Sequence, residues 1–141
     1  MLAEQPIADW RAADRDVAVD AKPQLFGLAS VVIDELFAEP SALAHDAAAY
    51  WSAHIASLRT RAYALADDEH ADERFEERMD VRVQTGEALT ALTRALLVAR
   101  AGRSLLRADT AQLHLRSAHF LLVQAQTDAV RAAQLQRLAR D

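Results

Sequence analysis

The stretch DERFEERMDVRVQTGEALTALTRALLVARA, residues 72–101, decides the fold class of this chain. Its apolar positions recur every three or four residues, which is the spacing of one face of an α-helix. These positions are Phe75, Met79, Val83, Gly86, Leu89, Leu92 and Leu96. Acidic residues open the stretch, where they suit the positive end of a helix dipole, and Gly102 follows as a stop signal. The pattern predicts one long amphipathic helix over about 72–101.

The residues before this stretch predict two more helices. Pro23 suits a first helical turn, and Pro40 ends the helix that it opens. The apolar face of that helix is expected at Leu25, Leu28, Val32 and Leu36. Ser41 is a good N-cap for a second helix over Ala42 to Ala66. The face of the second helix is expected at Leu43, Ala47, Tyr50, His54, Leu58 and Leu65.

Two shorter helical segments are predicted after Gly102. Asp109 or Thr110 would cap the first, which runs over about 111–124. Its end, Phe120–Val123, is apolar on every side and is expected to be buried. Thr127 or Asp128 would cap the second, which runs to Leu138. The chain has only three glycines and three prolines and many alanines, which favours long helices.

The fold class that follows is all-α, and the architecture expected is an up-and-down four-helix bundle. Residues 23–141 form the bundle domain, and residues 1–22 form a lead-in arm with Trp10 as its large apolar anchor. The formal net charge is −5 and the basic residues are dispersed, which argues against a nucleic-acid surface. No apolar run reaches the roughly 18 residues of a membrane span, so we expect no membrane partner and a cytoplasmic location.

No group of residues has the pattern of a catalytic or metal site. The acidic run 67–73 with His70 could bind a divalent ion, but a solvated loop that opens a helix explains it better. His114 and His119 are five residues apart and point to different helix faces. The chain has no cysteine, so it has no thiolate chemistry. Five arginines with acids three or four residues away are expected to be solvated: Arg59, Arg61, Arg74, Arg78 and Arg82.

Three pieces of the C-terminal half resemble the end of acyl-CoA dehydrogenases. They are AGRS at 101–104, AQLHLRSA at 111–118 and QAQT at 124–127. Without gaps, Gly102 aligns with the second glycine of the family's Gly-Gly-x-Gly turn, Arg116 with the arginine of its Arg-Asp pair, and Thr127 with the threonine of its Glu-Gly-Thr turn. Further stretches resemble the bacterial acyl-CoA dehydrogenase-like branch, namely ADWRAAD at 8–14, LFGLA at 25–29, RAYALADD at 61–68 and FLLVQAQT at 120–127.

The chain departs from this family at its functional positions. The family's catalytic base is the Glu of Glu-Gly-Thr, and Ala125 stands there in this chain, where a methyl group cannot accept a proton. The glycine-rich turn reads Ala101-Gly102-Arg103-Ser104, whose side chains would crowd a backbone that must approach the flavin. The family's N-terminal helical domain and middle β domain, which supplies much of the flavin and acyl-CoA site, are absent from these 141 residues.

The resemblance implies a non-catalytic helical-bundle subunit with a role in assembly. It would form a homodimer, or a hetero-oligomer with a larger flavin-dependent acyl-CoA dehydrogenase-like protein. Alone it would hold no cofactor; FAD could be bound only with a partner, through Gly102, Arg116 and Thr127, and no metal site is expected. Two alternatives remain open: a freestanding bundle that binds a small acyl-type or flavin-type molecule, and a fragment of a full-length flavin enzyme.

Overall fold

The computed structural model describes residues 19–140, which contain five α-helices and two short 3₁₀ helices. In chain order these elements are α2 (Pro23–Phe37), α3 (Ala42–Ala66), η1 (Ala71–Arg74), α4 (Phe75–Arg100), η2 (Ala101–Leu105), α5 (Ala111–Val123) and α6 (Asp128–Leu138). No strand occurs in this range, so the prediction of an all-α fold is confirmed. Trp10 and the rest of residues 1–18 lie outside the described part.

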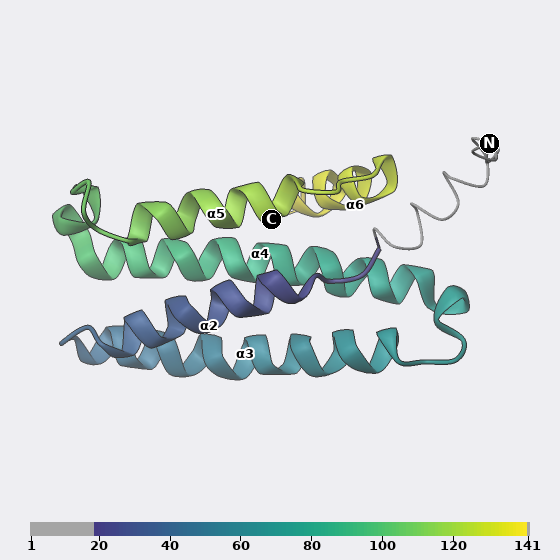
Figure 1. Ribbon diagram of the computed structural model, residues 1–141, viewed down its shortest axis with the longest axis horizontal. Helices are drawn as coiled ribbons and strands as arrows, with labels where there is room; N and C mark the ends of the chain where they lie inside the picture. Colours follow the sequence, from purple (N-terminus) through teal and green to yellow (C-terminus); the bar gives the residue numbers. More distant parts are fainter. Residues whose placement is uncertain (1–18, 141) are drawn as a thin grey trace, which may run out of the picture.

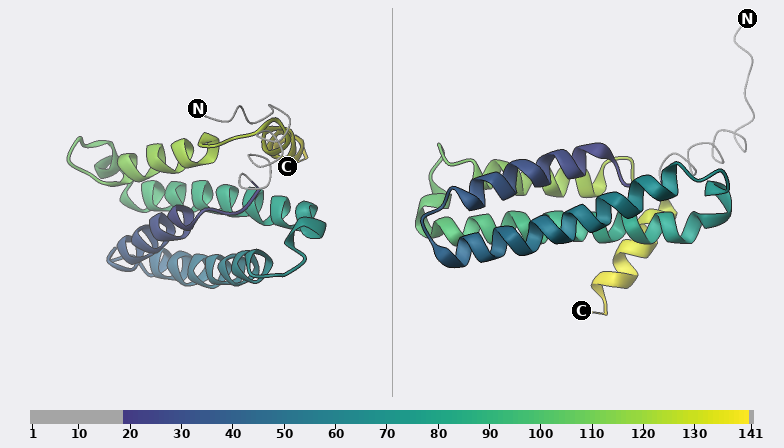
Figure 2. Two further views of the ribbon diagram at one scale, coloured as in Figure 1. Left: turned by 45° about the vertical axis from the view of Figure 1, so that its right-hand side comes forward. Right: turned by 90° about the horizontal axis from the view of Figure 1, so that it is seen from below.

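Helix α4 is central to the arrangement. Its apolar face, from Met79 to Leu96, is buried as the sequence predicts. It packs against α3, α5, α2 and α6. Successive helices from α2 to α5 alternate in direction, whereas α6 crosses the end of α4 at an angle (Figures 1 and 2). A second, smaller cluster joins Val19 to Met79, Val83 and Val130, so α6 is held at the N-terminal end of α4.

The prediction of which face of α3 is buried is wrong in part. Leu43 and Tyr50 are 80% and 62% exposed. The buried line of α3 is instead Ala44, Ala48, Ile55, Leu58, Ala62 and Leu65. Alanines occur all round this helix, so two adjacent lines have helical spacing, and only the position of α2 and α4 decides which one is covered.

The expected burial of Phe120–Val123 is also wrong, because α5 has α4 and α2 on one side only. Phe120 and Val123 are exposed, and the two leucines between them are half-buried. Of the predicted caps, the Thr127 hydroxyl accepts a hydrogen bond from the Val130 amide at 3.3 Å. Ser41 occupies the N-cap position of α3 without a side-chain cap bond.

Two of the arginines expected in solvent, Arg78 and Arg82, are buried. Arg78 forms a two-pronged ion pair with Asp20, at 2.7 Å from Nε and 2.8 Å from Nη2. Arg82 donates from Nη2 to the carbonyls of Gln124 and Ala125 at 3.2 and 3.3 Å. Their helix face is covered by the segment before α2 and by the α5–α6 turn, which local charge spacing does not show.

Candidate functional site

A line of side chains on α3, beside its buried line, borders an open groove. Leu43, Ala47 and Trp51 lie four residues apart, which places them on one stripe of the helix. Leu43 and Ala47 belong to the face that the sequence predicts to be buried, whereas Trp51 does not. In the folded chain no described helix covers this stripe completely, so part of its apolar surface stays open.

The other wall of the groove comes from α4. Its lining side chains there are Ala91, Arg94, Ala95, Val98 and Ala99. The groove has a volume of about 750 Å³, and buried Leu36 of α2 forms part of its lining. Val98 is 73% exposed, and it lies with Leu43 near the α2–α3 turn, where Ser41 also lines the groove. Two prominent apolar side chains therefore stand at one end of an alanine-rich floor.

Arg94 is the single charged residue among the groove-lining side chains. It is exposed, and within residues 19–140 it has no carboxylate within ion-pair distance. Next to it, a smaller cavity of about 290 Å³ continues the groove past Trp51 and His54. The Trp51 and His54 rings meet edge to face, with centroids 5.8 Å apart. The groove is thus apolar with a positive charge on its α4 wall.

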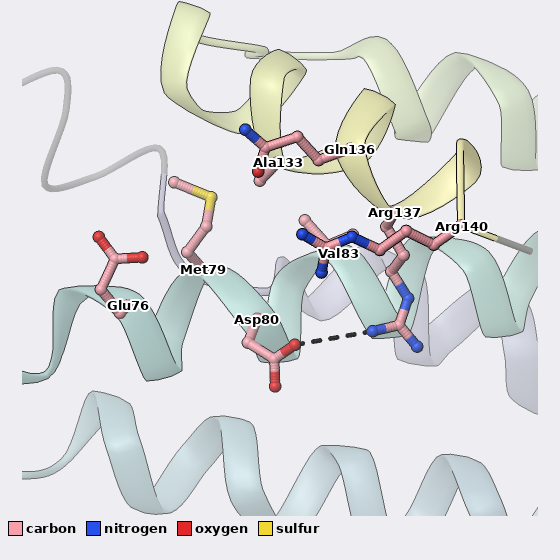
Figure 3. A pocket seen from close by; sticks show the side chains of 8 residues that line it. All are labelled: Glu76, Met79, Asp80, Val83, Ala133, Gln136, Arg137 and Arg140. Atoms are coloured by element: carbon pink, nitrogen blue, oxygen red, sulfur yellow. Dashed lines mark ion pairs between the residues drawn. The ribbon is translucent and has the colours of Figure 1, made fainter.

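A second cavity, between α4 and α6, is more polar (Figure 3). It has a volume of about 470 Å³, and Met79, Val83 and Ala133 contribute its apolar part. The guanidinium of Arg137 reaches across it to Asp80 at 3.8 Å and also contacts Glu87. Because these carboxylates already neutralise Arg137, this arginine is not free to bind an anionic ligand in the cavity.

A partly buried charge cluster joins the ends of α2 and α4 to the start of α5. Arg100 is within 2.7 Å of Glu39, 2.8 Å of Glu35 and 3.0 Å of Asp109. The hydrogen bond from Arg100 is the main cause that lowers the pKa of Glu39. Burial raises the pKa of Glu35, but hydrogen bonds from Thr110 and His114 outweigh it, and the net pKa is lowered.

The cluster is built to stabilise ionised carboxylates. The pKa of Asp109 is also lowered, first because the Ala111 amide donates to its side chain. A general acid or base works best when its pKa lies near the operating pH. Carboxylates whose pKa values lie below their ordinary range are unsuited to that role, so this cluster joins helices rather than moving protons.

The residues aligned with the dehydrogenase motifs lie at two ends of α5. Gly102 is exposed in η2, before the helix, and Ala125 and Thr127 are in the turn after it. Arg116 is exposed in the middle of α5, facing the 105–110 loop. Since α5 has 13 residues, its ends are about 20 Å apart. The fold brings Ala125 and Thr127 together and keeps Gly102 apart from them.

Backbone strain near the glycine-rich turn falls on Ala101 rather than on Gly102. Ala101, the C-cap of α4, has φ 47° and ψ −132°, whereas no glycine has positive φ in the described range. Such a conformation costs an L-residue about 1–3 kcal/mol, and glycine adopts it freely. We expect Ala101→Gly to raise the free energy of unfolding by about 1 kcal/mol, measured by urea denaturation.

The matched control is Gly102→Ala, one residue along. A Cβ added at Gly102 would meet no atom within 4 Å, so this change is expected to alter stability by less than about 0.5 kcal/mol. Destabilisation by Ala101→Gly would show that the strain at Ala101 does not exist in solution.

Comparisons with known proteins assign no family to this chain. No protein family, characterised protein or solved structure matches the chain significantly. Between residues 19 and 140, no helix has the length and apolar character needed to cross a membrane. The same residues contain no group of three His, Asp or Glu side chains that could hold a metal ion.

The sequence analysis named Leu43 and Ala47 of the groove but expected them in the core, and it singled out neither Trp51 nor the α4 wall. The spacing of Leu43, Ala47 and His54 was interpreted as a core stripe. One signal could have corrected this: Ala44, Ala48, Ile55 and Leu58 form a second apolar line one residue further along the chain. A helix with two such lines has more apolar surface than a single neighbour covers.

Proposed function

We propose that this chain is a non-catalytic assembly subunit that associates through the α3/α4 groove with itself or with a larger partner. The observation that carries the proposal is the open apolar groove, with Leu43 and Val98 largely exposed at one end. Full burial of one such side chain is worth about 1.5–3 kcal/mol, so a partner that covers both gains substantially.

The family resemblance supports the same role. The alternating directions of α2 to α5 agree with an up-and-down four-helix bundle like the C-terminal domain of acyl-CoA dehydrogenases, with α6 as an addition. The partner proposed on this basis is a flavin-dependent acyl-CoA dehydrogenase-like protein in the cytoplasm. FAD would belong to the complex, since the chain resembles only the helical domain and its turn at 101–104 has one glycine where the family has three.

Charging the groove is expected to abolish association. In the double variant Leu43→Glu with Val98→Glu, two carboxylates would have to be desolvated at any interface on this face. Light scattering at micromolar concentration, with mass spectrometry of proteins that co-purify from the host, measures the assembly. We expect the wild-type chain to be recovered as a homo-oligomer or with a dehydrogenase-like protein, and the double variant as a single chain.

Leu105→Glu is the matched control, because Leu105 is similarly exposed but lies on η2, outside the groove. It should leave the assembly intact. A wild-type chain that scatters as a monomer and recovers no dehydrogenase-like protein contradicts the proposed function, as does an assembly that the groove variant does not weaken.

A further inference from the structure

We propose that the α3/α4 groove binds an amphipathic helix of a different protein, one that places an acidic side chain against Arg94. This inference rests on the proposed function and adds the chemistry of the partner. Its basis is the shape of the groove together with the unbalanced charge of its lining.

The shape of the groove fits a helix. Its floor and walls include five alanines, which let another backbone approach closely: Ala44, Ala47, Ala91, Ala95 and Ala99. Along α3 the lining runs from Leu43 to Trp51, about 12 Å or two helical turns. Helix α2 already packs against both α3 and α4, and its Leu36 reaches the groove from beneath. A helix laid in the groove would pack against the same pair from the open side.

The charge of the groove selects against a second copy of this chain. In a symmetric dimer the same patch meets itself, so a cation in the patch needs an anion in the same patch. The lining contains Arg94 and no aspartate or glutamate. Glu87 lines the adjoining cavity, but Arg137 already pairs with it. Two copies joined through this face would therefore bring two arginines to the interface without a carboxylate from the groove. A partner helix with an acid beside its apolar stripe supplies the missing charge.

Trp51 provides a direct reporter of occupancy because it lines the groove. The chain has two tryptophans, so the full-length Trp10→Phe protein keeps Trp51 as its single one. The probes are two synthetic amphipathic peptides with the same leucine stripe at i, i+3, i+4 and i+7, one flanked by glutamates and the other by lysines. Each is titrated while Trp51 emission and peptide helicity are recorded.

We expect the glutamate peptide to bind saturably, shift Trp51 emission to the blue and gain helicity. The lysine peptide is expected to bind about three- to fivefold more weakly, since attraction to the exposed Arg94 becomes repulsion. Arg94→Glu should reverse this preference. Arg107→Glu makes the same change of charge at an exposed arginine outside the groove, and it should leave the preference unchanged.

Each other outcome overturns the inference in a distinguishable way. Equal binding of both peptides, or a preference that Arg94→Glu does not reverse, overturns the charge selection and leaves the proposed function standing. A blue shift of Trp51 on concentration alone, lost in Leu43→Glu, identifies a second copy as the occupant. Decanoate is titrated in the same way as a third probe. A response to decanoate but to neither peptide makes the groove a small-amphiphile site and contradicts the proposed function as well. No response to any probe overturns the helix-binding groove itself.

Discussion

Replacing Arg100 by methionine is expected to lower the free energy of unfolding by about 1.5–3 kcal/mol. Arg100 lies between three carboxylates, those of Glu35, Glu39 and Asp109, and donates a further hydrogen bond to Thr110. Glu39 and Asp109 have side chains only 8% and 10% exposed. Methionine fills much of the volume but removes the cation that these carboxylates share. Arg103 stays paired with Glu39 at 2.5 Å, so the loss is smaller than for a buried carboxylate left wholly without a counter-ion.

Urea denaturation of the wild type, Arg100→Met and two controls tests this expectation. Arg107→Met removes an exposed arginine from the neighbouring loop and should change stability by less than about 0.5 kcal/mol. Arg100→Met combined with Glu39→Gln should recover part of the loss, because one of the three carboxylates that shared the lost cation becomes neutral. A loss below about 1 kcal/mol in Arg100→Met would show that water reaches the cluster and screens it.

The opposite sign is expected for Arg82 of α4, which is buried and, within residues 19–140, has no carboxylate at ion-pair distance. Arg82→Met is expected to raise the free energy of unfolding by about 1–2 kcal/mol. Arg82 is 5% exposed, and its buried Nη1 atom has no hydrogen-bond partner among the residues that the structure describes. Burial lowers the pKa of this guanidinium, which reflects the cost of keeping a charge there.

The two hydrogen bonds that Arg82→Met removes are replaceable. They reach the carbonyls of Gln124 and Ala125, which belong to exposed residues that water can contact. Arg82→Lys is the control: it keeps a buried charge but loses the fork geometry, so it should be less stable than the wild type. Destabilisation by Arg82→Met would mean that the link from α4 to the α5–α6 turn outweighs the cost of the buried charge.

Local sequence signals located most helix ends within one or two residues. Pro23 and Pro40 bracket α2, and Thr127 caps α6 as predicted. The C-terminal end of α4 is an exception. The sequence predicts that Gly102 ends this helix, but the residue with positive φ is Ala101. The local pattern marks the neighbourhood of a helix end, while the exact residue that takes the strained conformation depends on how the chain continues into η2.

The sequence by itself determined the all-α class and the buried face of α4, because helical periodicity and the scarcity of glycine and proline are properties of the local chain. Only the tertiary structure decided which of the two apolar lines of α3 is covered, and it left Leu43, Ala47 and Trp51 along an open groove. It also decided the surroundings of two arginines of α4. Arg82 is buried with one nitrogen unpaired among the described residues, whereas Arg100 is largely enclosed by carboxylates. The physical reason is that burial and charge pairing depend on which distant segments lie against a helix, and spacing within one helix carries no information about its neighbours.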